Sequence, residues 1–280
     1  MIYQEIPLNG LLSDWDQSDE NARLTLYLQQ PSAEWSENAI FPCVLICPGG
    51  GYEMTSDREA EPVALKYAGM GYSVAVLRYS TNHRHFPVQL CELSMAMVWL
   101  RRNAAQFCLN AQQIAVCGFS AGGHLAASLC NLYDLPLLQE AMPMEKGENR
   151  PDAAILGYPV ISTGSCAHVG SFQNMFGNDL DENTRQILSL ENSVHENCPP
   201  CFIWHTADDD CVPSENSLLY ALALKHCNVP FELHLYPHGP HGLSLCDCTT
   251  SNLPTHKLAD VAAWFALSVR FLDKTLAVSR

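Results

Sequence analysis

"VCGFSAGGHLAAS", residues 116–128, is the stretch that decides the fold. It places Ser120 in a Gly-x-Ser-x-Gly pattern, after a short apolar run and before a run that favours helix. A strand, a tight turn and a helix in that order are the context in which a nucleophilic serine stands above a sheet. Glycines at 118 and 122 suit such a crowded turn, although small residues also mark ordinary strand-to-helix turns. The stretch predicts an α/β fold with Ser120 as the candidate nucleophile.

The composition limits what the chain can be. Its 280 residues are 48% hydrophobic and only 16% charged, which is enough to bury a substantial core, and we expect a single domain over residues 1–280. The net charge of −15 disfavours nucleic acid and an anionic membrane as partners. A small-molecule substrate is the expected partner, and the sequence is also compatible with a homo-oligomer.

The cysteines and the N-terminus indicate a cytoplasmic protein. The chain starts "MIYQEIPLNGLLSDWDQ", without the basic start and apolar core of a secretion signal, and no apolar run reaches membrane-spanning length. Its 13 cysteines are scattered, as expected of reduced thiols. Cys198 and Cys201 have redox spacing, but two prolines separate them and no second metal-spaced pair accompanies them. We therefore expect neither a metal nor a cofactor.

Apolar runs of strand and helix type alternate along most of the chain. Such alternation predicts a mostly parallel sheet covered by helices on both faces. Strands are expected at 23–28, 43–47, 73–78, 114–117, 153–156, 202–205 and 231–236, and helices at 59–69, 88–108, 123–129, 214–226 and 256–276. Residues 161–197 interrupt the alternation with a long polar stretch, which predicts a cap or lid insertion.

Two loops that follow late strands offer partners for the serine. A serine hydroxyl needs a base within hydrogen-bond reach, and the base needs a third group to orient it. His241, flanked by Pro240 and Gly242, is the favoured base, and His238 in the same loop is the alternative. The run 208–210 supplies three aspartates, of which the spacing to the following Val-Pro favours Asp209 as the orienting acid. The order Ser, Asp, His is that of the α/β-hydrolases.

Backbone N–H groups near the serine are candidates for an oxyanion hole. Ala121 begins the expected helix, where free amides favour negative charge. Gly50 or Gly51 of the Pro-Gly-Gly-Gly run can supply the second donor, because glycine lets the backbone approach a substrate closely. Tyr52 and Tyr158 follow expected strands near the same edge of the sheet and are candidate walls of the substrate pocket, with core packing as the alternative.

Several segments in the correct order resemble one family. "CPGGGY", "IAVCGFSAGGHLAAS", "FIWHTADDDCVPSENS" and "GPHGLSL" are similar to segments of the α/β-hydrolases of the small carboxylesterase and acetyl-xylan-esterase-like group. The resemblance covers nearly the whole chain from about residue 22, and it implies Ser120 as nucleophile, Asp209 as acid and His241 as base. Pro48 departs from the histidine that relatives of the hormone-sensitive-lipase type carry before the glycines. The resemblance implies short acyl esters as substrates, often acetyl groups on sugars.

Two other functions are compatible with this fold. A peptidase of the prolyl-oligopeptidase type shares the catalytic domain, but such enzymes usually carry an extra propeller domain for which 280 residues leave no room. A non-catalytic binding protein on a hydrolase fold is the second alternative, since fold alone does not imply function. Such proteins tend to lose one of the three residues, whereas all three are present here. We therefore expect a serine ester hydrolase.

Overall fold

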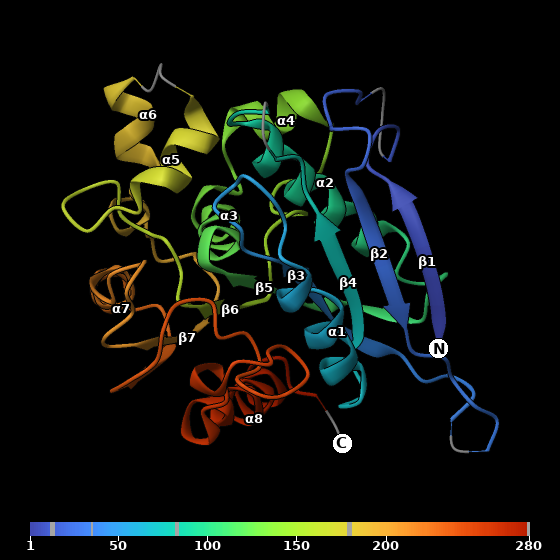
Figure 1. Cartoon of the computed structure of the whole chain (residues 1–280). Helices are drawn as coiled ribbons and strands as arrows, with labels where there is room; N and C mark the ends of the chain where they lie inside the picture. The colour runs from blue at the N-terminus through green and yellow to red at the C-terminus, as the bar shows by residue number, and fades with distance from the viewer. Residues whose placement is uncertain (12–14, 35, 82–83, 178–180, 279–280) are drawn as a thin grey trace.

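One mixed β-sheet forms the centre of the molecule. The structure is a computed structural model that describes residues 1–11, 15–34, 36–81, 84–177 and 181–278. Within these residues, eight strands form one sheet in the order β1-β2-β4-β3-β5-β6-β7-β8 (Figure 1). The strands are β1 (Ile2–Pro7), β2 (Arg23–Leu28), β3 (Phe41–Cys47), β4 (Ser73–Arg78), β5 (Leu109–Phe119), β6 (Ala153–Gly157), β7 (Cys201–Thr206) and β8 (Phe231–Tyr236).

The sheet is parallel from β4 to β8, and only the β1–β2 and β2–β4 pairings are antiparallel. The parallel strands are rich in Val, Ile, Leu, Ala and Cys, and nearly every residue of β3, β4, β6 and β7 is buried. Continuous apolar strands of this kind need cover on both faces. Because parallel strands end at the same edge, the loops after β3, β5, β7 and β8 meet there.

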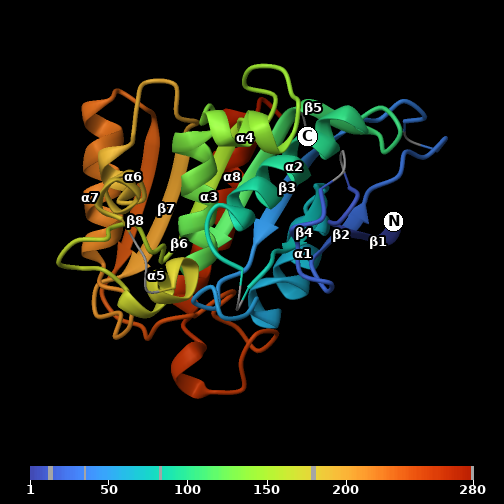
Figure 2. The same cartoon turned by 90° about the horizontal axis from the view of Figure 1, so that it is seen from above.

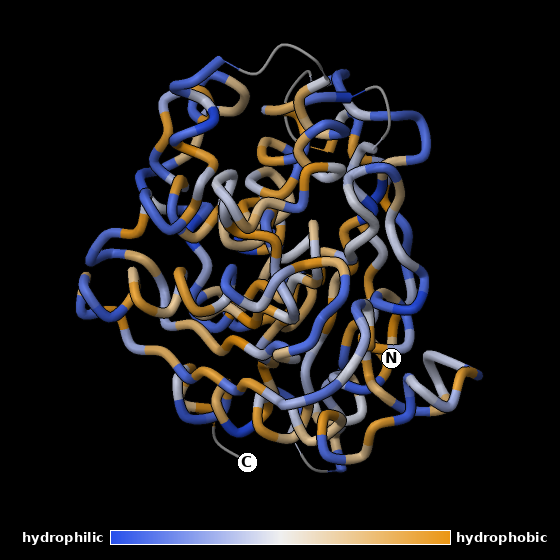
Figure 3. The backbone as a smooth tube through the Cα atoms, turned by 60° about the vertical axis from the view of Figure 1, so that its left-hand side comes forward, coloured by the Kyte–Doolittle hydropathy of each residue, from blue (hydrophilic) through white to orange (hydrophobic). Residues whose placement is uncertain are grey.

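Helices cover the sheet on both faces. The helices α2 (Val88–Arg102), α3 (Ser120–Leu132) and α7 (Glu215–His226) pack on one face, and α1 (Glu61–Ala68) and α8 (Ala259–Thr275) pack on the other. Figure 1 shows α2 and α3 above the sheet and α1 and α8 below it, and Figure 2 shows the same layers from above. The hydrophobic stretches of the backbone concentrate inside, and the hydrophilic ones run along the outer loops (Figure 3). The predicted mostly parallel sheet, covered by helices on both faces, is confirmed.

Most differences from the expected elements lie at the edges of the fold. The helix expected over 88–108 ends at Arg102, where Asn103 donates its side-chain amide to the Trp99 carbonyl. Strand β1 was not expected, because five of its six residues are exposed and an edge strand needs no apolar pattern. The short helix α4 (Pro136–Ala141) was also missed. None of the described helices has the length and apolar character needed to cross a membrane.

The segment 161–197 forms short helices beside the carboxyl ends of the strands. It contains α5 (Val169–Phe176), α6 (Glu182–Ile187) and a turn of 3-10 helix, η2 (Leu190–Asn192). Residues 178–180 of the expected cap lie outside the described residues. Figure 1 shows α5 and α6 next to one another at one end of the molecule, beyond α3. The side-chain amide of Asn174 in α5 donates to the carbonyl of Gly51, which ties this segment to the glycine loop after β3.

Candidate active site

Ser120 lies on a strained turn between β5 and α3. Its φ is 53°, in a region that residues with a Cβ rarely adopt, and Ser120 is 7% exposed. The turn is so crowded that a Cβ on Gly118 would collide with the Gly122 backbone. A Cβ on Gly122 would likewise collide with the backbone at the end of β3. Glycine at both positions is therefore a steric requirement of the turn that presents Ser120.

The structure brings Ser120, His241 and Asp209 together in one line of contacts. His241 Nε2 lies 2.8 Å from Ser120 Oγ, and His241 Nδ1 lies 2.7 Å from Asp209 Oδ2. A carboxylate can only accept, so Nδ1 carries the imidazole proton and Nε2 of the neutral ring accepts from the serine hydroxyl. The arrangement can move a proton from Ser120 to His241 while Asp209 fixes the ring and stabilises the cation that forms.

Asp209 is held as a buried carboxylate. Its side chain is 1% exposed, and its Oδ1 accepts the backbone N–H groups of Cys211 and Val212 at 2.9 and 2.8 Å. Burial by itself raises the pKa of Asp209, but hydrogen bonds from His205 and His241 and the charge of His241 outweigh it. The pKa of this carboxyl is therefore well below its usual range. Asp209 therefore stays charged at neutral pH.

All three aspartates of the run 208–210 hold the loop that carries His241. The Asp208 carboxylate accepts the backbone N–H of Gly239 at 2.7 Å and contacts His238 Nδ1 at 3.0 Å. Asp210 accepts the backbone N–H of His241 at 3.2 Å. Of the three, Asp209 is the one whose carboxylate contacts the His241 ring.

His205 is a second neighbour of Asp209 that the sequence reasoning missed. It is fully buried near the end of β7, and its Nε2 lies 3.2 Å from Asp209 Oδ2 and 3.0 Å from the Val212 carbonyl. Its Nδ1 lies 2.7 Å from the Ser217 hydroxyl in α7. A histidine four residues before the candidate acid, inside an apolar strand, was the available signal. His205 ties the acid to the sheet and to α7.

The glycine loop after β3 offers N–H groups near the serine. Gly50 and Gly51 have φ values of 128° and 64°, and a Cβ on Gly50 would collide with the carbonyl of Met54. Among the described residues, neither glycine has a hydrogen-bond acceptor for its N–H. The N–H of Ala121 lies in the first turn of α3, where no earlier carbonyl of the helix can accept it. No acceptor among the described residues therefore competes with an anionic oxygen for these N–H groups.

Tyr52 and Tyr158 do not line the site as expected. Their side chains are 1% and 2% exposed, so neither ring presents a face to a ligand. The Tyr52 hydroxyl lies 2.9 Å from His124 Nδ1, and the Tyr158 hydroxyl donates to Glu59 at 2.6 Å. Both tyrosines follow strands at the correct edge, but neighbouring helices and loops cover them, which the sequence around them does not reveal. They support the loops that carry the site.

His124 is another buried residue that the sequence reasoning missed. It lies one helical turn after Ser120, and its Nε2 lies 3.0 Å from the Leu188 carbonyl. The Tyr52 contact on its other nitrogen completes a link from the glycine loop through α3 to the segment 161–197. Burial lowers the pKa of His124 to about 4, so the ring is neutral near pH 7.

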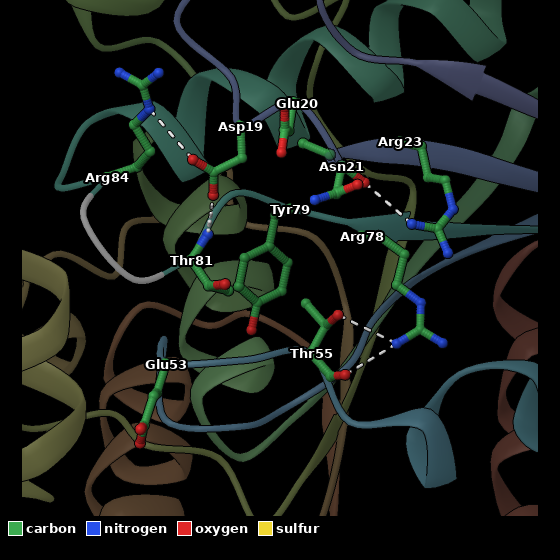
Figure 4. A pocket seen from close by; sticks show the side chains of 11 residues that line it. Asp19, Glu20, Asn21, Arg23, Glu53, Thr55, Arg78, Tyr79, Thr81 and Arg84 are labelled. Carbon is green, nitrogen blue, oxygen red and sulfur yellow. Dashed lines mark hydrogen bonds and ion pairs between the residues drawn. The ribbon is translucent and has the colours of Figure 1, made fainter.

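A cavity of about 650 Å³ lies apart from the serine, beside β2 and β4 (Figure 4). Ser120, Asp209 and His241 do not line it. Three arginines do, and each is paired with a carboxylate: Arg23 with Glu5, Arg78 with Asp57 and Arg84 with Asp19. Because these guanidinium groups are neutralised and further acids, Glu20 and Glu53, line the cavity, it does not favour an anion.

The fold and the serine-bearing turn define the class of protein, which is the α/β-hydrolases. Within that class the chain belongs to the BD-FAE family, whose model matches residues 26–224. An endo-1,4-beta-xylanase B of Butyrivibrio fibrisolvens is 35% identical over 212 residues, which cover 73% of this chain and 33% of that protein. An acetylxylan esterase of Xylanibacter ruminicola is 31% identical over 214 residues, covering 74% of this chain and 42% of that protein. The chain thus spans well under half the length of these two relatives.

Solved structures show the same relationship over nearly the whole chain. An acetyl ester-xyloside bifunctional hydrolase from Caldicellulosiruptor lactoaceticus is 33% identical, with a TM-score of 0.82 over 97% of this chain and 96% of that chain. A carboxylesterase from Lactobacillus plantarum is 25% identical, with a TM-score of 0.85 over the full length of both chains. The comparisons confirm the predicted family and fold.

Proposed function

We propose that this protein is a serine ester hydrolase that cleaves short-chain acyl esters, among them acetyl groups carried by carbohydrates. The observation that carries the proposal is the contact chain from Ser120 Oγ through His241 to the buried Asp209 carboxylate. The names of the relatives supply the substrate class: an acetylxylan esterase and an acetyl ester-xyloside hydrolase are similar to this chain.

In the proposed mechanism, Ser120 Oγ attacks the ester carbonyl carbon while His241 Nε2 takes the hydroxyl proton. The oxyanion that forms accepts the N–H of Ala121 and that of Gly50 or Gly51. The tetrahedral intermediate collapses, the C–O bond to the alcohol breaks, and His241 returns the proton to the departing oxygen. Water, deprotonated by His241, then attacks the acyl carbon, the bond to Ser120 Oγ breaks, and His241 returns the proton to Oγ as the acid leaves. Each oxyanion donor contributes about 2.7–4 kcal/mol to transition-state stabilisation in enzymes of this kind.

Replacing Ser120 tests the proposal directly. Ser120→Ala removes the attacking atom without opening a core cavity, so the fold should survive while kcat falls about 10⁶-fold. The matched control is Ser128→Ala, two turns further along α3, whose hydroxyl donates to the His124 carbonyl. Wild type and the Ser128 variant should label with a fluorophosphonate and hydrolyse p-nitrophenyl acetate. A Ser120 variant that still labels, or turns over at a near-normal rate, would disprove the assignment.

The acyl chain length separates an esterase from a lipase. We propose that the segment 161–197 caps the site and restricts the acyl group. Each added methylene changes discrimination by about 1–3 kcal/mol in a tight pocket, so acetyl and butyryl esters should be cleaved fastest and kcat/KM should fall by octanoyl. A series of p-nitrophenyl esters, followed by acetylated xylo-oligosaccharides, measures this. A maximum at dodecanoyl would contradict the short-chain proposal, and cleavage of a peptide substrate instead would favour the peptidase alternative.

We also propose that the protein works in a reducing compartment such as the cytoplasm. All thirteen cysteines lie in the described part of the chain, and none of them forms a disulfide. Burial raises the pKa of several of these thiols, such as Cys43 and Cys91, to about 12, which keeps them protonated and unreactive. Free thiols in this number are compatible with reducing surroundings.

A further inference from the structure

Glu59 is a buried carboxyl group next to the candidate site that the proposed mechanism does not use. It is 4% exposed and is the last residue of a short 3-10 turn, η1 (Asp57–Glu59), in the loop that follows the glycines. Its Oε2 accepts the N–H of Gly49 at 2.7 Å, and its Oε1 accepts the hydroxyl of Tyr158 at 2.6 Å. Within the described residues, no lysine, arginine or histidine forms an ion pair with it. Burying a carboxyl group without a cation is costly, so these two hydrogen bonds are what hold it in place.

The first hydrogen bond fixes the backbone beneath the serine. Gly49 packs so closely against the serine-bearing turn that a Cβ on it would lie 2.9 Å from the Cβ of Ser120 and 2.7 Å from the Phe119 carbonyl oxygen. Gly50, a candidate oxyanion donor, is the next residue. The position of the Gly49 amide therefore determines where the Gly50 N–H lies relative to Ser120 Oγ.

The second hydrogen bond reaches the histidine loop. Burial, with the Glu59 carboxyl beside it, raises the pKa of Tyr158 well above its usual value, so its hydroxyl keeps its proton and donates to Glu59. The Tyr158 oxygen also accepts the backbone N–H of Ser244 at 2.8 Å, three residues after His241. The Tyr158 ring lies edge-on to the His241 ring, with centroids 5.0 Å apart. Glu59 thus fixes the side chain on which His241 packs.

The neighbouring Arg58 makes contacts to the same histidine loop. Its guanidinium donates to the carbonyls of Gly242 and Thr250, and its own carbonyl accepts the Ser244 hydroxyl at 2.6 Å. The η1 turn therefore contacts the histidine loop directly through Arg58 and indirectly, by way of Tyr158, through Glu59. Only Glu59 also contacts the glycine loop beneath the nucleophile.

We propose that Glu59 is a positioning residue that holds the oxyanion loop and the His241 loop at a fixed distance from one another across Ser120. The inference rests on the proposed function and adds a residue to it. Among the described residues, Glu59 forms no hydrogen bond with Ser120, His241 or Asp209. It therefore acts through its hydrogen bonds with Gly49 and Tyr158. Its carboxylate suits this role because it offers two acceptor oxygens to two separate donors.

The Glu59→Gln variant tests this with little change in volume. Glutamine keeps one acceptor oxygen, but its amide nitrogen must then face either the Gly49 N–H or the Tyr158 hydroxyl. A displacement of about 1 Å in a catalytic group can cost about 100-fold, so we expect kcat to fall 10-fold to 100-fold with KM within about twofold. The matched control is Glu61→Gln, two residues further along and exposed, which should leave both constants unchanged.

Tyr158→Phe provides a second variant that keeps the ring but removes the hydroxyl, and with it the hydrogen bonds to Glu59 and from the Ser244 N–H. It should lower kcat in the same direction as Glu59→Gln, and the double variant should lose less than the product of the two single losses, because both break the same connection. Thermal melting confirms that each variant is folded at the assay temperature. The inference would be overturned if the Glu59→Gln and Tyr158→Phe variants were both folded and both had the kcat of the wild type.

Two further measurements separate this inference from the proposed function. The rate of fluorophosphonate labelling reports on Ser120 and its oxyanion hole without any ester substrate, and it should fall in Glu59→Gln but not in Glu61→Gln. The proton resonance of His241 Nδ1 should shift in the same variant, and this readout needs no activity at all. A wild type that neither labels nor turns over would refute the proposed function. An unchanged labelling rate and resonance in Glu59→Gln would refute the positioning role.

Discussion

Two histidine–aspartate pairs join the same two loops of this molecule, yet only one of them faces the serine. His241 and Asp209 contact each other at 2.7 Å, with side chains 17% and 1% exposed. His238 and Asp208, each close by in sequence, contact each other at 3.0 Å with side chains 83% and 53% exposed. The chemistry of the two pairs is the same, and their surroundings differ.

The difference shows that burial and additional partners distinguish a candidate catalytic pair from a surface ion pair. Asp209 accepts hydrogen bonds from Cys211, Val212 and His205 as well as from His241. A side chain with that many fixed partners cannot turn away, so it holds the imidazole in one tautomer and one orientation. The exposed pair of His238 and Asp208 is screened by solvent and contributes little to stability. Comparing matched substitutions in the two pairs tests this conclusion.

Removing the two histidines should give the largest contrast. His241→Ala leaves Ser120 without a base, and kcat should fall about 10⁵-fold to 10⁶-fold. His238→Ala should leave kcat within about threefold, because its ring points into solvent and is far more exposed than His241. Steady-state hydrolysis of p-nitrophenyl acetate measures both. A large loss in His238→Ala with little loss in His241→Ala would assign the base to the alternative residue of the loop.

Neutralising the two aspartates should give the next largest contrast. Asp209→Asn preserves shape but can donate to His241 Nδ1, which favours the wrong tautomer, and a drop in kcat of about 10⁴-fold is expected by analogy with serine proteases. Asp208→Asn should keep nearly full activity, since its carboxylate contacts His238 and the Gly239 amide and, among the described residues, forms no hydrogen bond with Ser120 or His241. Equal losses in the two variants would show that the loop contacts, and not the buried carboxylate, determine activity.

A pH titration of stability extends the comparison from pairs to single histidines. Burial lowers the pKa of His124 to about 4, below the ordinary value of 6.5, so the unfolded chain binds this proton more readily than the folded one. Stability should therefore fall as the pH is lowered from 6.5 to 4, by about 3 kcal/mol from this residue. Urea unfolding at a series of pH values gives the free energy of unfolding as a function of pH. In His124→Gln, the decrease in this free energy between pH 6.5 and 4 should be smaller than in the wild type. His238→Gln should show the same decrease as the wild type. The same pH dependence in wild type and His124→Gln would contradict the lowered pKa of His124.

The third aspartate should give the smallest effect. Asp210 accepts the backbone N–H of His241 at 3.2 Å, so Asp210→Asn keeps an acceptor oxygen for that bond. Asp210→Ala removes it and leaves the loop less restrained. We expect kcat to fall less than about threefold in the first variant and about threefold to tenfold in the second. If Asp210→Asn lost as much activity as Asp209→Asn, the role of the orienting acid could not be assigned to Asp209 alone.

The sequence determined the parts of this protein that depend on local backbone requirements. The turn at Ser120 is recognisable because a strained, crowded strand-to-helix turn accepts glycine at 118 and 122 and little else. The alternation of apolar strands and helices predicted the sheet, since a parallel sheet buried on both faces needs continuous apolar runs. The strands β2, β4 and β8 have the bounds that this pattern predicts.

The tertiary structure decided which side chains meet and which are buried. Asp208 and Asp209 are adjacent and chemically identical, and only packing against β7 and α7 places one in the interior and leaves the other in solvent. Tyr158 and Glu59 are 99 residues apart, and nothing in the local sequence of either indicates that they meet. Hydrogen bonds between distant segments are strengthened where burial excludes water from both partners, so the sequence indicated the nucleophile while long-range packing selected its partners.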